Sequence, residues 1–353
     1  MSSTTYRVGI IGCGGIARAH ARGYAKVPAT QLVAGADPDA SQQSKFKTSF
    51  PGLTMYKDYR EMLDKENLDL VSVCTWPPLH AEMVIAAAEH SPKGIVCEKP
   101  MALNLGEVDQ MLEACDLHNV KLIVGHQRRF DQRYVEAKEA LKRGEIGELV
   151  AVYGSSGGDL LTCGTHTIDL LRFFADDQPI KWVMGQIQRQ KWGRIGFSTK
   201  VYGHEAEQAA VGRFEFANGV RGLMEQGEIT LGGSTPWRRH WFVTLEGTEG
   251  RIEVDGDPER GGPPSGWRIR RSGEKEWEVH LIENPPNAIA REIAELIRWI
   301  EEGGDHLLCG SSARADTEVL MAIYESARRR GRVNLPLKVF DNPLIAMVEA
   351  GEI

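Results

Sequence analysis

The sequence has no two cysteines at the C-x-x-C spacing, although it contains six cysteines among 353 residues. Zinc sites and disulfide frameworks bring their cysteines together in such close, repeated spacings. We therefore expect neither kind of site, assign no residue to a metal, and expect the thiols to be reduced and mostly buried. The cysteines are Cys13, Cys74, Cys97, Cys115, Cys163 and Cys309.

Long apolar runs and an excess of basic residues are also missing. Nowhere do about 18 apolar residues follow one another, as a membrane-spanning helix would require, and the segment Met1–Arg7 lacks the apolar stretch of a secretory signal. The net charge of −7, from 42 basic and 49 acidic residues, offers no electrostatic attraction to nucleic acid or to an anionic membrane. We expect a cytoplasmic protein that binds a small molecule, with neither a nucleic acid nor a membrane as its partner.

Near its beginning the sequence contains an apolar strand that runs into clustered glycines, RVGIIGCGGIA at residues 7–17. Gly12 would allow a tight turn, and Gly14 would let the backbone approach a phosphate closely. Gly15 and Ile16 would open a helix whose free N–H groups and positive dipole end can hold an anion. This order of strand, glycine turn and helix predicts a site for the pyrophosphate of a dinucleotide.

Asp37 supports this interpretation and indicates which dinucleotide is bound. It closes a second apolar strand, 25 residues after Gly12. A carboxylate at this place can accept hydrogen bonds from both hydroxyls of the adenine ribose, and it would repel a 2′-phosphate. The sequence therefore favours NAD over NADP as the cofactor. The alternative is a glycine turn followed by an unrelated aspartate at the end of a strand.

Apolar strands and helical patterns continue to alternate as far as residue 124. Short apolar runs without alternation, such as Leu68–Cys74, suit strands that are buried on both faces of a parallel sheet. We expect an α/β fold for residues 1–125, an NAD-binding Rossmann domain with a doubly wound parallel sheet of about six strands. The later segments of this domain are expected as strands at 53–56, 68–74, 94–97 and 120–124 and helices at 59–65, 79–90 and 105–118.

The remainder of the chain reads mainly as strands that are joined by short polar turns. Asn218-Gly219 between two of them is a strong signal for a hairpin turn. We expect residues 126–353 to form an α+β domain for substrate binding and oligomerisation, with a large, open, mainly antiparallel sheet. One face of this sheet would be left for another subunit, so we expect a homodimer or homotetramer. The expected strands are 149–154, 181–191, 208–216, 220–229, 239–246, 250–254, 267–271 and 276–281, and the helices are 132–143, 159–175, 288–301 and 312–330.

Three strand ends in the first domain carry polar residues at the edge where a parallel sheet binds its ligand. They lie in Thr75–Pro78, Glu98–Pro100 and Gly125–Phe130. A lysine near a cationic nicotinamide and shielded from water has its charged form disfavoured, which makes proton exchange with a hydroxyl feasible. Lys99 is therefore a candidate catalytic residue, and Glu98 beside it a positioning group. A solvated pair of charges at a strand end is the alternative.

His166 is the second candidate for proton transfer. Within the expected helix 159–175, four polar residues lie three or four positions apart, on one face: Asp159, Thr162, His166 and Asp169. A histidine on such a stripe can exchange a proton near neutral pH, although a structural histidine is the alternative. Because Asp159 follows two glycines, we interpret it first as the N-cap of the helix and second as a contact to the substrate.

These motifs together resemble the Gfo/Idh/MocA oxidoreductases, the group of glucose-fructose oxidoreductase and inositol dehydrogenase. The resemblance spans almost the whole chain, and its most specific element is Glu98–Pro100 combined with Gly164–His166 and Asp169. It implies a Rossmann domain followed by an open antiparallel sheet that lines the substrate site and packs between subunits. It also implies hydride transfer between NAD(P) and a carbon of a sugar or polyol, with Lys99 and His166 in the catalytic positions.

The resemblance further assigns residues to the two ligands. Thr75 and Trp76 match the loop that runs beside the cofactor, and Gln127 matches a position near the nicotinamide. The residues expected to contact the cofactor are Gly12, Gly14, Gly15, Ile16, Asp37, Thr75, Trp76, His80, Glu98, Lys99 and Gln127. Those expected to contact the substrate are Lys99, Gln127, Asp159, Thr162 and His166.

One residue departs from the family pattern. Many dehydrogenating members have an aspartate four residues before the histidine, where this sequence has Thr162. A threonine hydroxyl cannot take up a proton near neutral pH. Any proton relay must therefore run through Lys99, His166 or water.

The leading hypothesis for function is an NAD-dependent dehydrogenase or reductase that acts on a secondary alcohol or ketone carbon of a sugar, glycoside, anhydrosugar or inositol. A second hypothesis is a glycoside-cleaving enzyme in which tightly bound NAD oxidises C3 only transiently. A third is a non-catalytic, NAD-sensing regulatory protein, against which the presence of both Lys99 and His166 argues. Trp237 and Trp241 could stack on a pyranose ring, or could pack within a strand.

Overall fold

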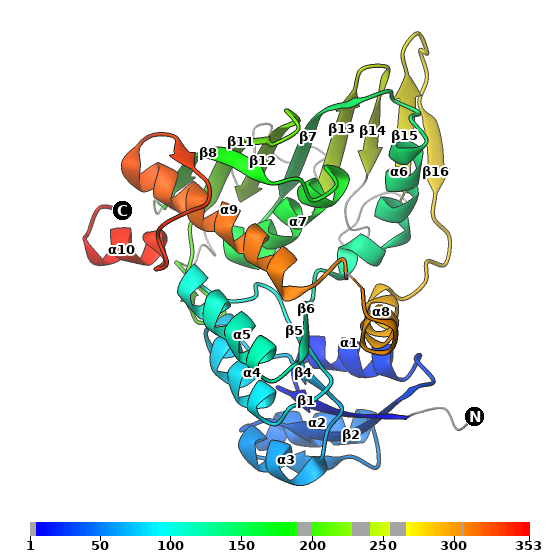
Figure 1. Cartoon of the computed structure of the whole chain (residues 1–353), viewed down its shortest axis with the longest axis vertical. Helices are drawn as coiled ribbons and strands as arrows, with labels where there is room; N and C mark the ends of the chain where they lie inside the picture. The colour runs from blue at the N-terminus through cyan, green and yellow to red at the C-terminus, as the bar shows by residue number, and fades with distance from the viewer. Residues whose placement is uncertain (1–4, 190–198, 228–240, 255–265, 305) are drawn as a thin grey trace. The chain divides into compact units, whose positions relative to one another are not determined.

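The structure is a computed structural model that describes residues 5–189, 199–227, 241–254, 266–304 and 306–353. The chain divides into two compact units (Figure 1). Among the described helices, none combines the length and the apolar character that crossing a bilayer requires. The six cysteines are free thiols, four of them buried. The first unit comprises Met1–Gln127 and Asn287–Arg314, and the second comprises Arg128–Pro286 and Ala315–Ile353.

A six-stranded parallel sheet forms the centre of the first unit, in the order β3-β2-β1-β4-β5-β6. This is the order of a doubly wound Rossmann sheet and confirms the predicted fold class. Strands β4 and β5 are buried along their whole length, which explains why their sequences are apolar runs without alternation. The strands are β1 (Tyr6–Ile11), β2 (Thr30–Ala36), β3 (Thr54–Tyr56), β4 (Leu70–Val73), β5 (Gly94–Cys97) and β6 (Lys121–Val124).

Helices follow each strand of this sheet, as the alternating pattern predicts. Several of them begin at a side-chain cap; Asn104, for example, accepts a hydrogen bond from the backbone N–H of Glu107 at 2.8 Å. The helices are α1 (Gly15–Tyr24), α2 (Ala40–Ser49), α3 (Tyr59–Glu66), η1 (Pro77–Leu79), α4 (His80–Glu89), α5 (Leu105–Leu117) and α8 (Ala288–Glu302), and the turn η2 (Gln127–Phe130) follows β6.

Helix α8 belongs to the first unit, whereas the sequence analysis assigned residues 287–314 to the second domain. It packs against α1 at Gly23, where a Cβ atom would lie only 2.8 Å from Ile289, so the close approach of the two helices needs a glycine. The hydroxyl of Tyr6 also donates to Glu301 at 3.1 Å. These partners come from opposite ends of the chain, so no local pattern in the sequence indicates their contact.

The second unit contains a nine-stranded sheet in the order β16-β15-β14-β13-β7-β12-β11-β8-β17. Neighbouring strands are antiparallel except for β7 and β12, which run parallel, so the predicted open and mainly antiparallel sheet is confirmed. The strands are β7 (Leu149–Ser156), β8 (Ile180–Gln188), β11 (Ala209–Phe216), β12 (Arg221–Gly227), β13 (Phe242–Gly247), β14 (Gly250–Val254), β15 (Gly266–Arg271), β16 (Glu278–Leu281) and β17 (Val333–Asn334).

Helices cover one face of this sheet, as Figure 1 shows for α6, α7 and α9. Thr167 and Leu171 of α7 contact Gly154 of β7, and Ile323 of α9 packs on Gly185 and Gly212. On the other face, Met184 is 50% exposed and Leu223 is 37% exposed, and both are paired with Arg213 of β11 between them. The helices are α6 (Gln132–Lys142), α7 (Thr165–Phe174), α9 (Gly310–Arg329) and α10 (Pro343–Glu349).

The structure differs from the predicted elements in two places that matter for the site. The helix expected at 159–175 begins as a single π-helical turn, η3 (Leu160–Gly164), before it continues as α7. A short hairpin of β9 (Lys200–Val201) and β10 (His204–Glu205) was not predicted, because two-residue strands carry no periodic signal. Trp237 and the rest of residues 228–240 lie outside the described residues.

Candidate active site

The loop between β1 and α1 forms a cradle of backbone groups. Gly12 has φ +84°, a conformation that side chains disfavour, and a Cβ atom there would lie 2.7 Å from the carbonyl oxygen of Cys74. At Gly14 and Gly15 a Cβ atom would meet nothing within 4 Å, so the backbone faces open space. Helix α1 starts at Gly15 with no side-chain cap. Its first N–H groups, including that of Ile16, therefore fit an anion such as a pyrophosphate.

Asp37 lies at the end of β2 beside this cradle. Its Oδ2 accepts the backbone N–H of Cys13 and its Oδ1 accepts that of Asp39, each at 2.8 Å. A carboxylate has about four lone-pair sites, so both oxygens can still accept from the hydroxyls of a ribose. The two amides fix the carboxylate in place, and this arrangement fits NAD.

A pocket of about 500 Å³ lies along the carboxyl ends of β1, β2 and β4. Its size is typical of small-molecule sites, which span roughly 300–1,000 Å³. Thr75 and Trp76 line it together with Gly12, Gly14 and Asp37, and Trp76 is 60% exposed. Sequence reasoning missed other lining residues, whose one signal is their place after a strand of the sheet: Gln42, Lys57, Tyr59, Leu79 and Met83.

Two of the expected ligand contacts carry buried polar atoms that have no hydrogen-bond partner within the described part of the chain. These atoms are Oγ1 of Thr75 and Oε1 of Gln127. A buried polar atom that stays unsatisfied costs about 1–3 kcal/mol. A ligand that donates to them would remove this cost, and both the ribose hydroxyls and the carboxamide of the nicotinamide can donate. The observation therefore fits a bound dinucleotide.

His80 is buried behind the loop that carries Thr75 and Trp76, and it does not line the pocket. Its ring nitrogens lie 2.8 Å from the carbonyl oxygen of Pro100 and 3.1 Å from that of Thr75. Burial lowers the pKa of His80, and the two carbonyl groups offset this only in part. The side chain links the Thr75 loop to the segment that carries Lys99, so the structure gives it a positioning place where the sequence analysis expected a cofactor contact.

Glu98 is also turned into the interior. Its Oε1 lies 2.9 Å from Nε2 of His20, and its Oε2 accepts the backbone N–H of Lys99 at 3.2 Å. The other ring nitrogen of His20 lies 3.2 Å from Oγ of Ser72, which lies 2.8 Å from the hydroxyl of Tyr24. This buried chain of polar groups joins α1, β4 and β5, and it holds the backbone at Lys99. Lys99 itself is half-buried.

Glu98 and His20 each stabilise the charged form of the other. Burial alone would lower the pKa of His20, but Cys74 and Glu98 more than offset it and raise that pKa to about 10. Burial would likewise raise the pKa of Glu98, whereas His20 and then Lys99 bring it below its ordinary value. The two groups therefore form a buried ion pair at neutral pH. Sequence reasoning missed His20. The signal that could have indicated it is its place on the buried face of the predicted helix.

In the second unit, His166 lies in the first turn of α7 and is 2% exposed. Its ring meets the ring of Trp241 edge to face, with centroids 5.5 Å apart. The indole N–H of Trp241 donates to the carbonyl oxygen of Cys163 at 3.1 Å. The guanidinium carbon of Arg128 lies 3.3 Å from the centre of the Trp241 ring. Trp241 therefore packs against the candidate catalytic histidine and fixes one side of it.

Two carboxylates hold the start of the π-helical turn that precedes α7. Oδ1 of Asp159 accepts the backbone N–H of Thr162 at 2.8 Å, so Asp159 serves as a cap, as first interpreted. Glu207 accepts the backbone N–H of Leu160 at 2.6 Å and the hydroxyl of Tyr324 at 2.7 Å. Burial, and then the nearby Asp159, raise the pKa of Glu207 to about 7. Sequence reasoning missed Glu207, which lies far along the chain from the turn that it holds.

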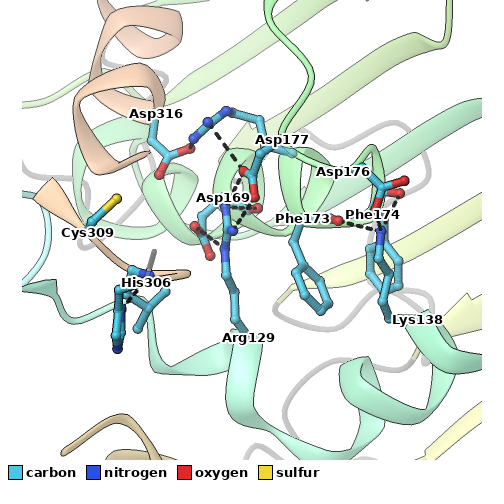
Figure 2. A network of polar contacts seen from close by, with 12 residues as sticks. Arg129, Lys138, Asp169, Phe173, Phe174, Asp176, Asp177, His306, Cys309 and Asp316 are labelled. Atoms are coloured by element: carbon cyan, nitrogen blue, oxygen red, sulfur yellow. Dashed lines mark hydrogen bonds and ion pairs between the residues drawn. The ribbon is translucent and has the colours of Figure 1, made fainter. Parts of the chain in front are cut away.

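Asp169, the last member of the predicted polar stripe, belongs to a buried ion network (Figure 2). Its Oδ1 accepts from Nε of Arg129 at 2.7 Å, and the other two guanidinium nitrogens of Arg129 donate to both oxygens of Asp177 at 2.7 and 2.8 Å. Arg172 donates to Asp316 of α9 at 2.7 Å. Burial raises the pKa of Asp169 well above its ordinary value, although Arg129 opposes this. Asp169 thus anchors α7 to Arg129.

The glycine cradle, the anchored Asp37 and the pocket at the strand ends together define the first unit as an NAD-binding Rossmann domain. The chain belongs to the Gfo/Idh/MocA family of oxidoreductases. A family model described as "Oxidoreductase family, NAD-binding Rossmann fold" matches residues 6–126, and the model of the GFO/IDH/MocA C-terminal domain matches residues 153–253.

Several characterised proteins are similar to this chain. Myo-inositol 2-dehydrogenase from Thermotoga maritima is 32% identical over 186 residues, which cover 49% of this chain and 55% of that protein. The chain thus spans about half the length of that relative. Inositol 2-dehydrogenase 3 from Saccharopolyspora erythraea is 28% identical over 96% of this chain and 97% of its own length. Levoglucosan dehydrogenase in complex with NADH and levoglucosan superimposes with a TM-score of 0.79 at 22% identity, over 95% of this chain and 100% of that one. This likeness shows the shared fold.

Proposed function

We propose that the protein transfers a hydride between NAD and a secondary alcohol or ketone carbon of a sugar, glycoside, anhydrosugar or inositol. The observation that carries the proposal is the Asp37 carboxylate, which two backbone amides fix beside the open glycine cradle. The substrate class is supported by the names of the relatives, which are inositol and levoglucosan dehydrogenases. Bound NAD supplies the carbon that accepts or returns the hydride.

The residues of the chain have separate tasks in this proposal. Lys99 and His166 are the groups that exchange the hydroxyl proton of the substrate, because an amine and an imidazole can each accept and return a proton. Asp37 binds the ribose hydroxyls, and Gln127 accepts a hydrogen bond from the cofactor or the substrate. Thr162 contacts a substrate hydroxyl; Asp159, which caps η3, keeps this turn in place.

A panel of inositols, anhydrosugars, monosaccharides and glycosides with NAD tests the proposal through the absorbance of NADH. We expect stoichiometric NADH from at least one member of the panel. Release of an aglycone without net NADH would instead establish the glycoside-cleaving alternative. NAD binding with neither reaction on any member would support the sensing protein and refute the dehydrogenase.

We also propose that the protein is a homodimer or homotetramer that buries the face of the nine-stranded sheet opposite to α6, α7 and α9. Met184 and Leu223 lie there on opposite sides of Arg213. Large apolar side chains that are exposed on a sheet face are typical of an interface between subunits.

A further inference from the structure

We propose that His204 is a positioning residue that fixes the direction of the Thr162 hydroxyl, so that Thr162 accepts a hydrogen bond from a substrate hydroxyl and selects a donor at that position. The proposal rests on the proposed function, because it assigns a substrate contact within the same site. His204 was not among the residues expected from the sequence. Oγ1 of Thr162 lies 3.4 Å from Nε2 of His204.

The first step concerns which nitrogen of His204 carries the proton. Nδ1 of His204 lies 2.8 Å from the carbonyl oxygen of Glu205. A carbonyl oxygen can only accept, and two acceptors at this distance would repel each other. In the neutral imidazole, Nδ1 therefore carries the hydrogen and Nε2 carries a lone pair.

The second step follows from the first. Since Nε2 has no hydrogen, the hydrogen bond between the two side chains needs the hydroxyl of Thr162 as its donor. The proton of Thr162 is then directed at His204, and the lone pairs of Oγ1 are what the hydroxyl offers to a ligand. A ligand group must donate to be bound there. A hydroxyl can do so, whereas a carbonyl oxygen cannot.

Other contacts hold both partners in place and so keep Thr162 and His204 within hydrogen-bonding distance of each other. His204 is 3% exposed and pairs with Val201 in the β9–β10 hairpin. The neighbouring Glu205 forms ion pairs with Arg189 and Lys200. Thr162 is half-buried, and the cap at Asp159 fixes its backbone four residues before His166. The oriented hydroxyl therefore belongs to the helical segment that also carries the candidate catalytic residue His166.

The first experiment needs no substrate. Nitrogen-15 spectra of the histidine side chains in the full chain should show one ring in the Nδ1–H form whose signals disappear in His204→Asn. Its Nε2 signal should move in Thr162→Val and stay close to its parental position in Thr162→Ser, which keeps the hydroxyl. An Nε2–H or doubly protonated ring, or a signal that Thr162→Val leaves in place, would overturn the pair.

The second experiment uses the substrate that the panel yields. Asparagine at 204 keeps an N–H for the Glu205 carbonyl but removes the acceptor at Nε2, whereas glutamine can offer an acceptor there. We expect His204→Asn to lower kcat/KM by about tenfold, mostly through KM, in the range for one lost hydrogen bond. His204→Gln should recover part of this loss, and His118→Asn, on a half-exposed histidine after α5, should have no effect.

The double variant Thr162→Val/His204→Asn should lose no more than Thr162→Val alone, because His204 acts through the hydroxyl that the valine removes. Additive losses, or a parental kcat/KM in His204→Asn, would show that His204 has no part in orienting Thr162. A panel without turnover would refute the proposed function instead, and the spectra would still decide whether the pair exists.

Discussion

At the scale of single residues, we propose that Asp37 decides which cofactor is bound. Its carboxylate is fixed by the amides of Cys13 and Asp39 and would repel a 2′-phosphate. We expect NAD to bind at least tenfold more tightly than NADP, and Asp37→Ser to narrow this difference. Titration of the protein fluorescence with each dinucleotide measures both. Asp37→Asn is the matched control, because it removes the charge and keeps the shape; tighter NADP binding by the parent protein would refute the assignment.

Lys99 is the residue on which the proposed chemistry depends most directly. Lys99→Met should leave NAD affinity within a few fold and lower turnover by about two to four orders of magnitude, which is the usual effect of a lost general acid or base. Steady-state kinetics on the substrate from the panel measures the change. Lys93→Met, at a surface lysine that pairs with Asp69, is the control. Turnover at the parental rate in Lys99→Met would show that Lys99 takes no part in proton transfer.

The sequence predicts residues that act through local geometry better than residues that act through distant partners. Gly12 and Asp37 follow from the order of strand, turn and helix, so their places could be expected. His20, His204 and Glu207 hold the site through partners that lie far along the chain. Their types are ordinary for buried or loop positions, and only the folded chain shows what they contact.

At the scale of elements, the buried pair of His20 and Glu98 connects α1 to the end of β5. The folded-state pKa of His20 is about 10, above its ordinary value of 6.5. A raised pKa contributes stability that is fully present below about pH 6.5 and is lost as the pH rises towards 10. The free energy of unfolding of the parent protein, relative to that of His20→Gln, should therefore fall across this window. Urea denaturation at both ends of the window measures it, and an unchanged difference would contradict the ion pair.

The anchoring of α7 depends on Arg129, which is fully buried and contacts Asp169 and Asp177. Arg129→Met would leave the buried Asp169 and the partly exposed Asp177 without this partner, so we expect a loss of about 3–5 kcal/mol in the free energy of unfolding. Chemical denaturation measures the loss. Lys142→Met, at a surface pair with Glu139, should change stability by less than about 1 kcal/mol. A similar small effect of Arg129→Met would show that the network does not hold the helix.

The order of the elements was predictable where a periodic pattern extends over several residues. The parallel sheet and the strands on either side of Asn218-Gly219 follow from such patterns. The π-helical turn at Leu160–Gly164 could not be predicted. The polar residues of this segment follow one another at intervals of three or four, which an ordinary α-helix also gives. In the structure Thr162 lies in this turn and His166 lies in α7, whereas the sequence analysis placed both on one regular helix.

At the scale of the whole molecule, the face of the nine-stranded sheet opposite to α6, α7 and α9 predicts assembly. We expect light scattering to give the mass of a dimer or tetramer at micromolar concentration. Met184→Lys together with Leu223→Lys should shift the mass towards that of a monomer, since charges placed in an apolar interface must be desolvated. Arg221→Lys, at an exposed position of the same strand, is the control. A monomeric parent protein would refute the predicted interface.

The return of α8 to the first unit determines when this unit can be completed during synthesis. A ribosome makes a chain from its N-terminal end, so residues 128–286 emerge before Asn287–Arg314 does. Until then α1 lacks the partner that covers Gly23, and the hydroxyl of Tyr6 lacks Glu301. A nascent chain that stops at residue 127 is therefore an unfinished dinucleotide-binding unit, which is completed only when Asn287–Arg314 has been made.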